Sequence, residues 1–182
     1  MTSVSPGEAR SRLTATAGGL VPTLVECFGL RLDGRRLVGR LVNVRLDGDP
    51  DETAAAAIGL RGSPLDGVAV LHSTSWRWHP DLGIVLTYVC APDPGTTIEV
   101  AAVAPAAGHP HHTIGPSRPG EAAPSTAQVL HHGIDHLAWL ADHHPHIVEP
   151  SRAADPELWA AILEGGRHRA GRLDHQHDRP VA

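Results

Sequence analysis

The segment GVAVLHSTSWRWHPDLGIVLTYVCAP, residues 67–92, decides the fold class of this chain. Two parts of it, residues 68–78 and 84–90, are rich in the β-branched and aromatic residues that favour strands. The intervening residues 79–83 combine Pro, Asp and Gly, a composition typical of a turn. Because the connection is short, we predict that the two strands pair antiparallel.

A second pair of strands precedes this segment. Apolar residues dominate 21–32 and alternate with polar residues in 37–46, and Asp33-Gly34 lies between the two runs. Asp-Gly in this setting predicts a hairpin, because both turn residues must tolerate a positive φ. Residues 98–103 can supply one further strand.

Three segments have the composition or periodicity of helices. The first is Ala-rich, with Asp49 or Asp51 as a candidate cap and an end near Gly59. The second begins after Pro124 and has an apolar residue at every third or fourth position. The third opens at Asp155-Pro156 and is expected to stop at Gly165-Gly166. These segments are residues 52–60, 125–143 and 156–163.

Strands followed by helices, with short antiparallel connections, predict a single α+β domain. We expect a mixed or antiparallel sheet, one short helix after the first hairpin and two C-terminal helices. The expected division of the chain is a flexible N-terminal segment at 1–17, the domain at 18–165 with a Pro-, Gly- and His-rich loop at 105–124, and a disordered tail at 166–182.

The composition argues against several classes of function. The chain has 182 residues and a net charge of −5, and each of its 15 basic residues is Arg. The absence of Lys removes Schiff-base chemistry and the Walker-type phosphate loop. Scattered Arg residues in an acidic chain do not favour nucleic-acid binding. No apolar run approaches the roughly 20 residues that cross a bilayer.

Cysteine usage and the N-terminal composition bear on the compartment. The first residues lack the apolar core of a secretory signal. Cys27 and Cys90 lie in separate predicted strands, where we expect two free, buried thiols. We therefore predict a cytoplasmic protein, and nothing in the sequence indicates a cofactor.

The long predicted helix carries a first chemical candidate. His132, His136 and His143 fall on the side opposite its apolar stripe, so we expect them to face solvent. Two His residues four positions apart can bind zinc or nickel together. A catalytic zinc usually takes three protein ligands, so we assign no metal ligand and keep metal binding as an alternative.

The predicted strand 68–78 carries a second candidate. Its alternation places Ser73, Ser75 and Arg77 on one side, where two hydroxyls and a guanidinium could bind a small anionic ligand. The alternative is that these three residues form the solvent face of an ordinary strand, with Trp76 and Trp78 in the core.

The order of elements resembles a reduced Nudix-type domain. Over residues 20–142, two strands precede a short helix that ends in Gly59-Leu60, and long antiparallel strands and a late helix follow. In that family the helix ends in Arg-Glu-apolar-x-Glu-Glu-x-Gly-apolar, and its glutamates bind Mg²⁺. Aligned on Gly59, the Arg position holds Glu52 and the three Glu positions hold Thr53, Ala56 and Ala57. Ala offers no oxygen ligand, so the resemblance implies a domain without the metal-dependent hydrolase activity.

We therefore expect a non-catalytic domain that binds a small anionic ligand or a protein. The alternative function is a His-dependent metal-binding protein or a metal-assisted hydrolase. Trp139 lies on the long helix away from the apolar stripe, where an exposed aromatic residue could mediate a homodimer. If the C-terminal helix folds back, it covers Trp139 instead.

Overall fold

A mixed sheet of five strands forms the centre of the computed structural model, which describes residues 22–79, 81–95, 102–103 and 124–167. The strand order is β3-β4-β1-β2-β5. The predicted single α+β fold with a mixed sheet is confirmed. The strands are β1 (Thr23–Asp33), β2 (Arg36–Arg45), β3 (Val70–His79), β4 (Gly83–Ala91) and β5 (Ala102–Val103).

Both predicted antiparallel pairs are present, and a parallel pair joins them. β1 pairs with β2, β3 pairs with β4, and β4 lies parallel to β1. The first turn falls one residue later than predicted, because Asp33 pairs with Arg36 and the turn residues are Gly34 and Arg35. Gly34 has a φ of 61°, which glycine adopts without strain.

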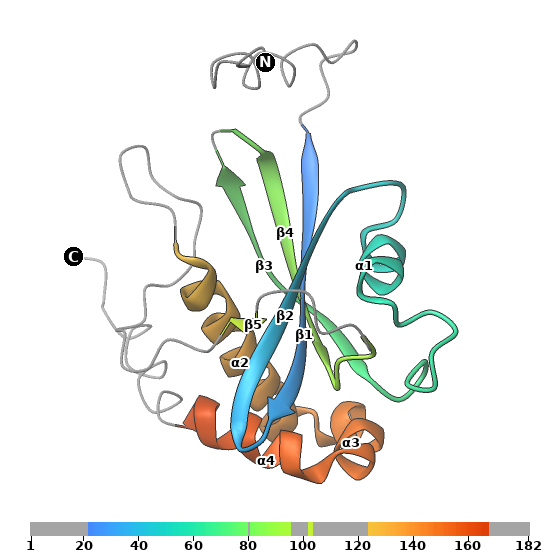
Figure 1. The fold of residues 1–182 in the computed structure, drawn as a ribbon, viewed down its shortest axis with the longest axis vertical. Helices are drawn as coiled ribbons and strands as arrows, with labels where there is room; N and C mark the ends of the chain where they lie inside the picture. Colours follow the sequence, from blue (N-terminus) through green and yellow to red (C-terminus); the bar gives the residue numbers. More distant parts are fainter. Residues whose placement is uncertain (1–21, 80, 96–101, 104–123, 168–182) are drawn as a thin grey trace, which may run out of the picture.

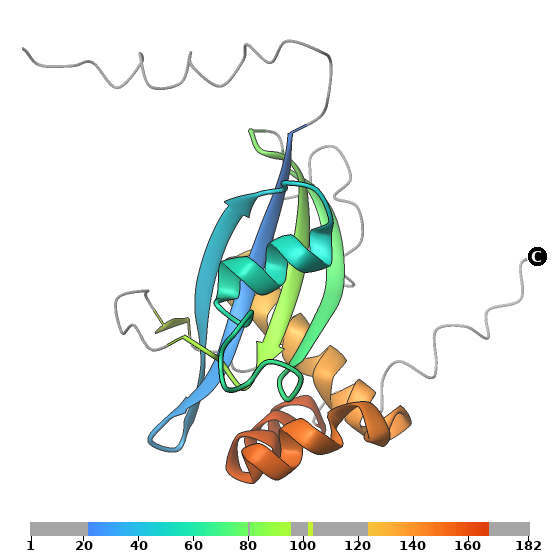
Figure 2. The same cartoon turned by 90° about the vertical axis from the view of Figure 1, so that its right-hand side faces the viewer.

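Helices cover both faces of the sheet (Figures 1 and 2). α1 (Pro50–Ile58) lies on one face, which we call the α1 face, over Val25, Cys27, Tyr88 and Cys90. α2 (Thr126–His143) lies on the opposite face, the α2 face, and α3 (Pro145–Ala154) and α4 (Pro156–Arg167) close its lower end. The second core is built mainly around Phe28, Leu30, Val89, Leu130, Ile134 and Trp159.

The first helix begins at one of its two candidate caps, and the second begins close to the predicted start. The Asp49 carboxylate accepts hydrogen bonds from the backbone of residues 51 and 52, and Gly59 ends α1 with a φ of 81°. α1 therefore spans 50–58 rather than 52–60. Ser125 and Gln128 form a reciprocal capping box at the start of α2.

The C-terminal helices differ from the prediction in two ways. α3 is an additional helix, which the sequence pattern missed because Pro145 begins it and Pro150 lies inside it. α4 starts at Pro156 as expected but continues through Gly165-Gly166 to Arg167, so the predicted stop is wrong. Gly166 serves helix packing instead: a Cβ there would overlap the Cβ of Ala138 on α2.

The two adjacent glycines of α4 should respond oppositely to alanine. Gly166→Ala should lower the free energy of unfolding by about 1–3 kcal/mol, because the added methyl group overpacks the contact with Ala138. A Cβ on Gly165 would meet Ile134 Cγ2 at 3.5 Å, an ordinary contact. Gly165→Ala should therefore raise stability by about 0.4–1 kcal/mol. Urea unfolding measures both changes, and equal effects would contradict this packing.

Several expectations fall on residues outside the described ranges. These are the N-terminal segment at 1–17, residues 98–101 of the last predicted strand, residues 105–123 of the predicted loop and residues 168–182 of the predicted tail. Within the described ranges, no helix combines the length and apolar character needed to cross a membrane.

Candidate functional site

A β-bulge in β3 divides the three residues predicted to bind an anion. The pairing with β4 shifts between Ser73 and Ser75, which leaves Thr74 as the extra residue. Ser73 is paired with Tyr88 and therefore lies on the α1 face. Ser75 and Arg77 follow the bulge and lie on the α2 face. The structure thus brings two of the three predicted residues together and separates Ser73 from them.

Arg77 is held in a polar cluster that spans three strands. Its Nη2 donates to Glu26 Oε2 at 2.9 Å and its Nη1 donates to Thr87 Oγ1 at 2.8 Å. Thr87 in turn donates to Glu26 Oε1 at 3.2 Å. The side chains of Arg77 and Glu26 are 11% and 8% exposed. Ser75 Oγ is buried beside this cluster without a hydrogen-bond partner. Because Glu26 neutralises Arg77, an anion could bind here only by displacing that carboxylate.

The same bulge exposes the two tryptophans of β3. Trp76 and Trp78 are 53% and 47% exposed, so their predicted place in the core is wrong. The physical reason is that the extra residue Thr74 inverts the alternation, which moves both indoles to the α1 face. α1 packs mainly against β1, β2 and β4, and the part of the edge strand β3 that carries Trp76 and Trp78 stays exposed. Leu82, in the turn after β3, is also exposed.

The histidines of α2 are arranged differently from the prediction. His132 and His136 are half-buried, and the His136 ring lies 6.0 Å from that of His72 on β3 and 4.5 Å from that of His132. His143 is separate from them and stacks on Trp139 with a centroid distance of 4.7 Å. α2 packs against both the sheet and α4, so the side of α2 opposite its apolar stripe is partly covered.

Trp139 itself is 46% exposed, so α4 does not cover it. Within the described part of the chain, no group of three or more His, Cys, Asp or Glu side chains is placed to hold a metal ion. The three clustered imidazoles are therefore a close set of polar rings rather than a formed metal site.

Burial of the histidine cluster makes stability depend on pH. Desolvation, followed by the charges of His132 and His72, lowers the pKa of His136 to about 4 from its ordinary 6.5. Burial also lowers the pKa of His72. Between pH 6.5 and about 4 the unfolded chain therefore binds more protons at these histidines than the folded chain does. The free energy of unfolding consequently falls as the pH drops through this range. Burial raises the pKa of Asp135 to about 7, which acts in the opposite direction.

His136→Phe should isolate the histidine contribution, because it keeps a ring and removes the titration. We expect the variant to lose less unfolding free energy than the wild type between pH 7 and about 4.5. Denaturant unfolding at several pH values measures the difference. His146→Phe, at an exposed position, is the matched control and should follow the wild type. Parallel curves for His136→Phe and the wild type would contradict the lowered pKa.

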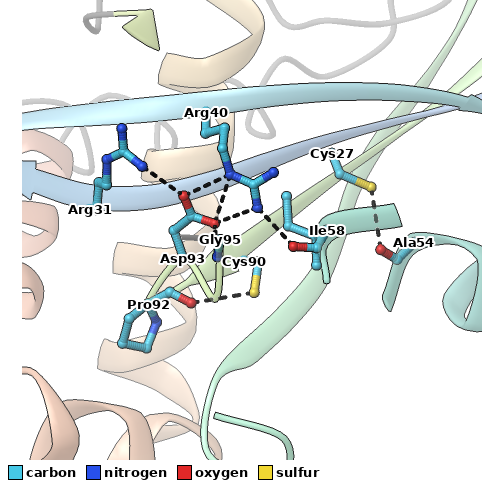
Figure 3. A network of polar contacts seen from close by, with 9 residues as sticks. All are labelled: Cys27, Arg31, Arg40, Ala54, Ile58, Cys90, Pro92, Asp93 and Gly95. Carbon is cyan, nitrogen blue, oxygen red and sulfur yellow. Dashed lines mark hydrogen bonds and ion pairs between the residues drawn. The ribbon is translucent and has the colours of Figure 1, made fainter. Parts of the chain in front are cut away.

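A buried ion pair that the sequence did not reveal lies on the α1 face (Figure 3). Arg40 Nη2 donates to Asp93 Oδ1 at 2.7 Å and to the Ile58 carbonyl oxygen at 2.7 Å. Arg40 Nε also donates to Asp93, whose side chain is fully buried. Arg31 adds a contact of 3.5 Å to the same carboxylate. The network joins β1, β2, the end of α1 and the segment after β4, and its charged groups pair with one another.

The two cysteines lie near this network (Figure 3). Both are free and buried, as predicted. Burial raises the pKa of both Cys27 and Cys90 to about 12. Neither thiol is therefore a thiolate near neutral pH, and neither is suited to nucleophilic or redox chemistry.

A groove of about 690 Å³ lies between α3 and α4. His146, Glu149 and Arg152 line it from α3, and Trp159 lies at its base. Because α3 was not predicted, this groove could not be found from the sequence. It presents both signs of charge along α3 and so favours neither an anion nor a cation.

Comparison of the chain with protein-family models, with curated proteins and with solved structures found no match in any of the three.

Proposed function

We propose that this chain is a non-catalytic binding domain, Nudix-like in its arrangement of elements but without the metal-binding carboxylates. The small-anion form of this proposal is the weaker one, because Arg77 is already neutralised by Glu26. The protein-binding form is supported by Trp76 and Trp78, which are exposed side by side on an edge strand. Exposed tryptophans of this kind are enriched where proteins bind one another.

The observation that carries the non-catalytic proposal is the state of α1. At the three positions where the resemblance would require glutamates, Thr53 donates its hydroxyl to backbone carbonyl oxygens, Ala56 is exposed and Ala57 is half-buried. The two acidic side chains of α1 already have partners: Asp51 accepts from Tyr88 at 2.6 Å, and Glu52 pairs with Arg61. The helix thus acts as a cover for the sheet, with Ala54, Ala55 and Ile58 in the core.

A turnover assay tests the non-catalytic proposal. Purified chain is incubated with a panel of nucleoside diphosphate compounds, with Mg²⁺ and with EDTA in parallel. We expect no product release above the blank in either condition, because α1 supplies no free carboxylates. Mg²⁺-dependent release that is lost on EDTA addition and falls in an Asp51→Asn variant would overturn the proposal.

The second candidate, a His-dependent metal-binding protein, is favoured by the contacts among His72, His132 and His136. In this cluster His72, which was not predicted from the sequence, takes the place of His143. Elemental analysis of tag-free protein after dialysis decides between the candidates. Stoichiometric zinc or nickel that is lost in His136→Phe would support the metal candidate, and a metal-free chain would remove it.

A further inference from the structure

We propose that the edge of β3 at residues 75–79 is a docking site for a positively charged, extended segment of another protein. This inference rests on the protein-binding form of the proposed function and adds the conformation and charge of the partner.

The free edge of β3 sets the conformation of that partner. β3 ends the strand order, so its outer backbone edge has no neighbouring strand among the described residues. The bulge at Thr74 interrupts this edge and leaves five regular residues after it. Such an edge can pair with an extended chain through backbone hydrogen bonds. On the α1 face the added strand would lie beside Trp76 and Trp78.

An acidic turn beside the tryptophans sets the charge of the partner. The turn from β2 to α1 begins at Leu46, whose N–H donates to Thr23 O at 2.9 Å, and Thr23 is in register with Ile84, the partner of Trp78. The turn ends at Asp51, which binds Tyr88, the partner of Ser73. The turn therefore crosses the sheet from β2 to β4 at the level of the tryptophan-bearing stretch of β3, and Figure 2 shows the chain arching from β2 across the α1 face.

The exposed charges of this turn have one sign, and Arg61, which follows α1, is paired with Glu52. Asp47, Asp49 and Asp51 lie exposed in the turn and at the start of α1. The nearest arginines in the sheet, Arg77 and Arg45, lie on the α2 face, and Arg77 is paired with Glu26. Lys and Arg side chains of a bound strand could therefore stack on the indoles and approach the carboxylates at the same time.

The same charges argue against other occupants. A nucleic acid would bring phosphates against three aspartates. A second copy of the chain would bring one acidic turn near another, which weakens association at low ionic strength. For a basic segment, both the apolar contacts with the tryptophans and the attraction to the aspartates favour binding.

Fluorescence anisotropy with two labelled peptides tests the inference. The probes are Lys-Val-Lys-Thr-Lys-Val-Lys and the same peptide with Glu at each Lys position, both carrying fluorescein. We expect the Lys peptide to bind at least tenfold more tightly than the Glu peptide at about 50 mM salt. The preference should shrink at about 0.5 M salt, where the Debye length falls below roughly 5 Å.

Two variants and a matched control locate the binding surface. Trp76→Ser with Trp78→Ser should weaken Lys-peptide binding more than tenfold. Trp139→Ser, which removes an equally exposed indole from α2, should leave it within twofold. Asp47, Asp49 and Asp51 changed together to Asn should weaken it several-fold, because Asn removes the charges while remaining a good cap for α1.

The possible outcomes separate the inference from the function on which it rests. Equal, tryptophan-dependent binding of both peptides would overturn the positive charge of the partner and leave a protein-binding edge. Binding of the Lys peptide that survives loss of Trp76 and Trp78, or no binding of either peptide, would overturn the docking site. Sedimentation showing a dimer that requires Trp76 and Trp78 would replace the basic partner with a second copy. The non-catalytic proposal is decided separately, by the turnover assay.

Discussion

Asp93→Ala should lower the free energy of unfolding by about 3–5 kcal/mol, one of the two largest effects that we predict for this chain. The substitution removes the carboxylate that accepts three hydrogen bonds from Arg40 and leaves that guanidinium buried with the Ile58 carbonyl oxygen as its remaining partner. Urea unfolding monitored by circular dichroism measures the loss. The backbone bond from Asp93 N to Leu30 O is unaffected by the change.

A surface pair provides the control for this prediction. Arg61 and Glu52 also form an ion pair, but their side chains are 52% and 63% exposed. Glu52→Ala should therefore cost no more than about 1 kcal/mol. Replacing Arg40 with Met together with Asp93→Ala should restore part of the loss, because no charge then remains buried. An Asp93→Ala variant as stable as Glu52→Ala would show that the buried pair does not hold these elements together.

Trp159→Ala should lower the free energy of unfolding by about 3–5 kcal/mol, because it removes the largest fully buried side chain. The indole fills the core between α4 and the sheet, and its Nε1 donates to Ser151 Oγ at 2.8 Å. Ser151 Oγ donates in turn to the carbonyl oxygen of Ala91 at 2.7 Å. The substitution thus opens a cavity and breaks a chain of hydrogen bonds that ties α4 and α3 to β4.

Trp139 supplies the matched control within the same helical layer. It is 46% exposed, so Trp139→Ala should change the unfolding free energy by about 0.5–1 kcal/mol at most. Denaturant unfolding of the two single variants under identical conditions separates burial from the mere loss of an indole. Similar losses in both variants would contradict the burial of Trp159.

The parts of the fold that local chemistry determines could be predicted from the sequence. The Asp33-Gly34 signal placed the first hairpin to within one residue, and Asp49, Ser125 and Asp155 marked three helix starts. Each of these signals acts within a few residues of the chain. The α+β class followed from their order.

The candidate site was predicted less well because it depends on a β-bulge and on contacts between residues far apart in the sequence. One extra residue, Thr74, reverses which face the following side chains occupy, and no strand pattern announces a bulge. The partnership of Arg40 with Asp93 joins residues 53 positions apart. Gly166 was expected to end a helix, but its missing side chain allows α4 to pack on α2. His72 could not be grouped with His136 before β3 and α2 were placed together.

The bulge also determines which side chains β3 places on each face of the sheet. Before it, β3 contributes Val70 and His72 to the α2 face, where the helices cover them. After it, the same strand buries Arg77 on that face and exposes Trp76 and Trp78 on the other. If Thr74 paired with β4 in regular alternation, Trp76 and Trp78 would lie on the α2 face instead, so the exposed aromatic edge depends on the bulge.

Binding of Mn²⁺ by the purified chain, followed by electron paramagnetic resonance, tests most directly whether α1 lacks a divalent-cation site. Mn²⁺ replaces Mg²⁺ at oxygen-ligand sites and loses its free signal when bound. We predict that the free-ion signal rises in proportion to added Mn²⁺, with no stoichiometric site. One tightly bound ion per chain that disappears in Asp51→Asn with Glu52→Gln would contradict the account.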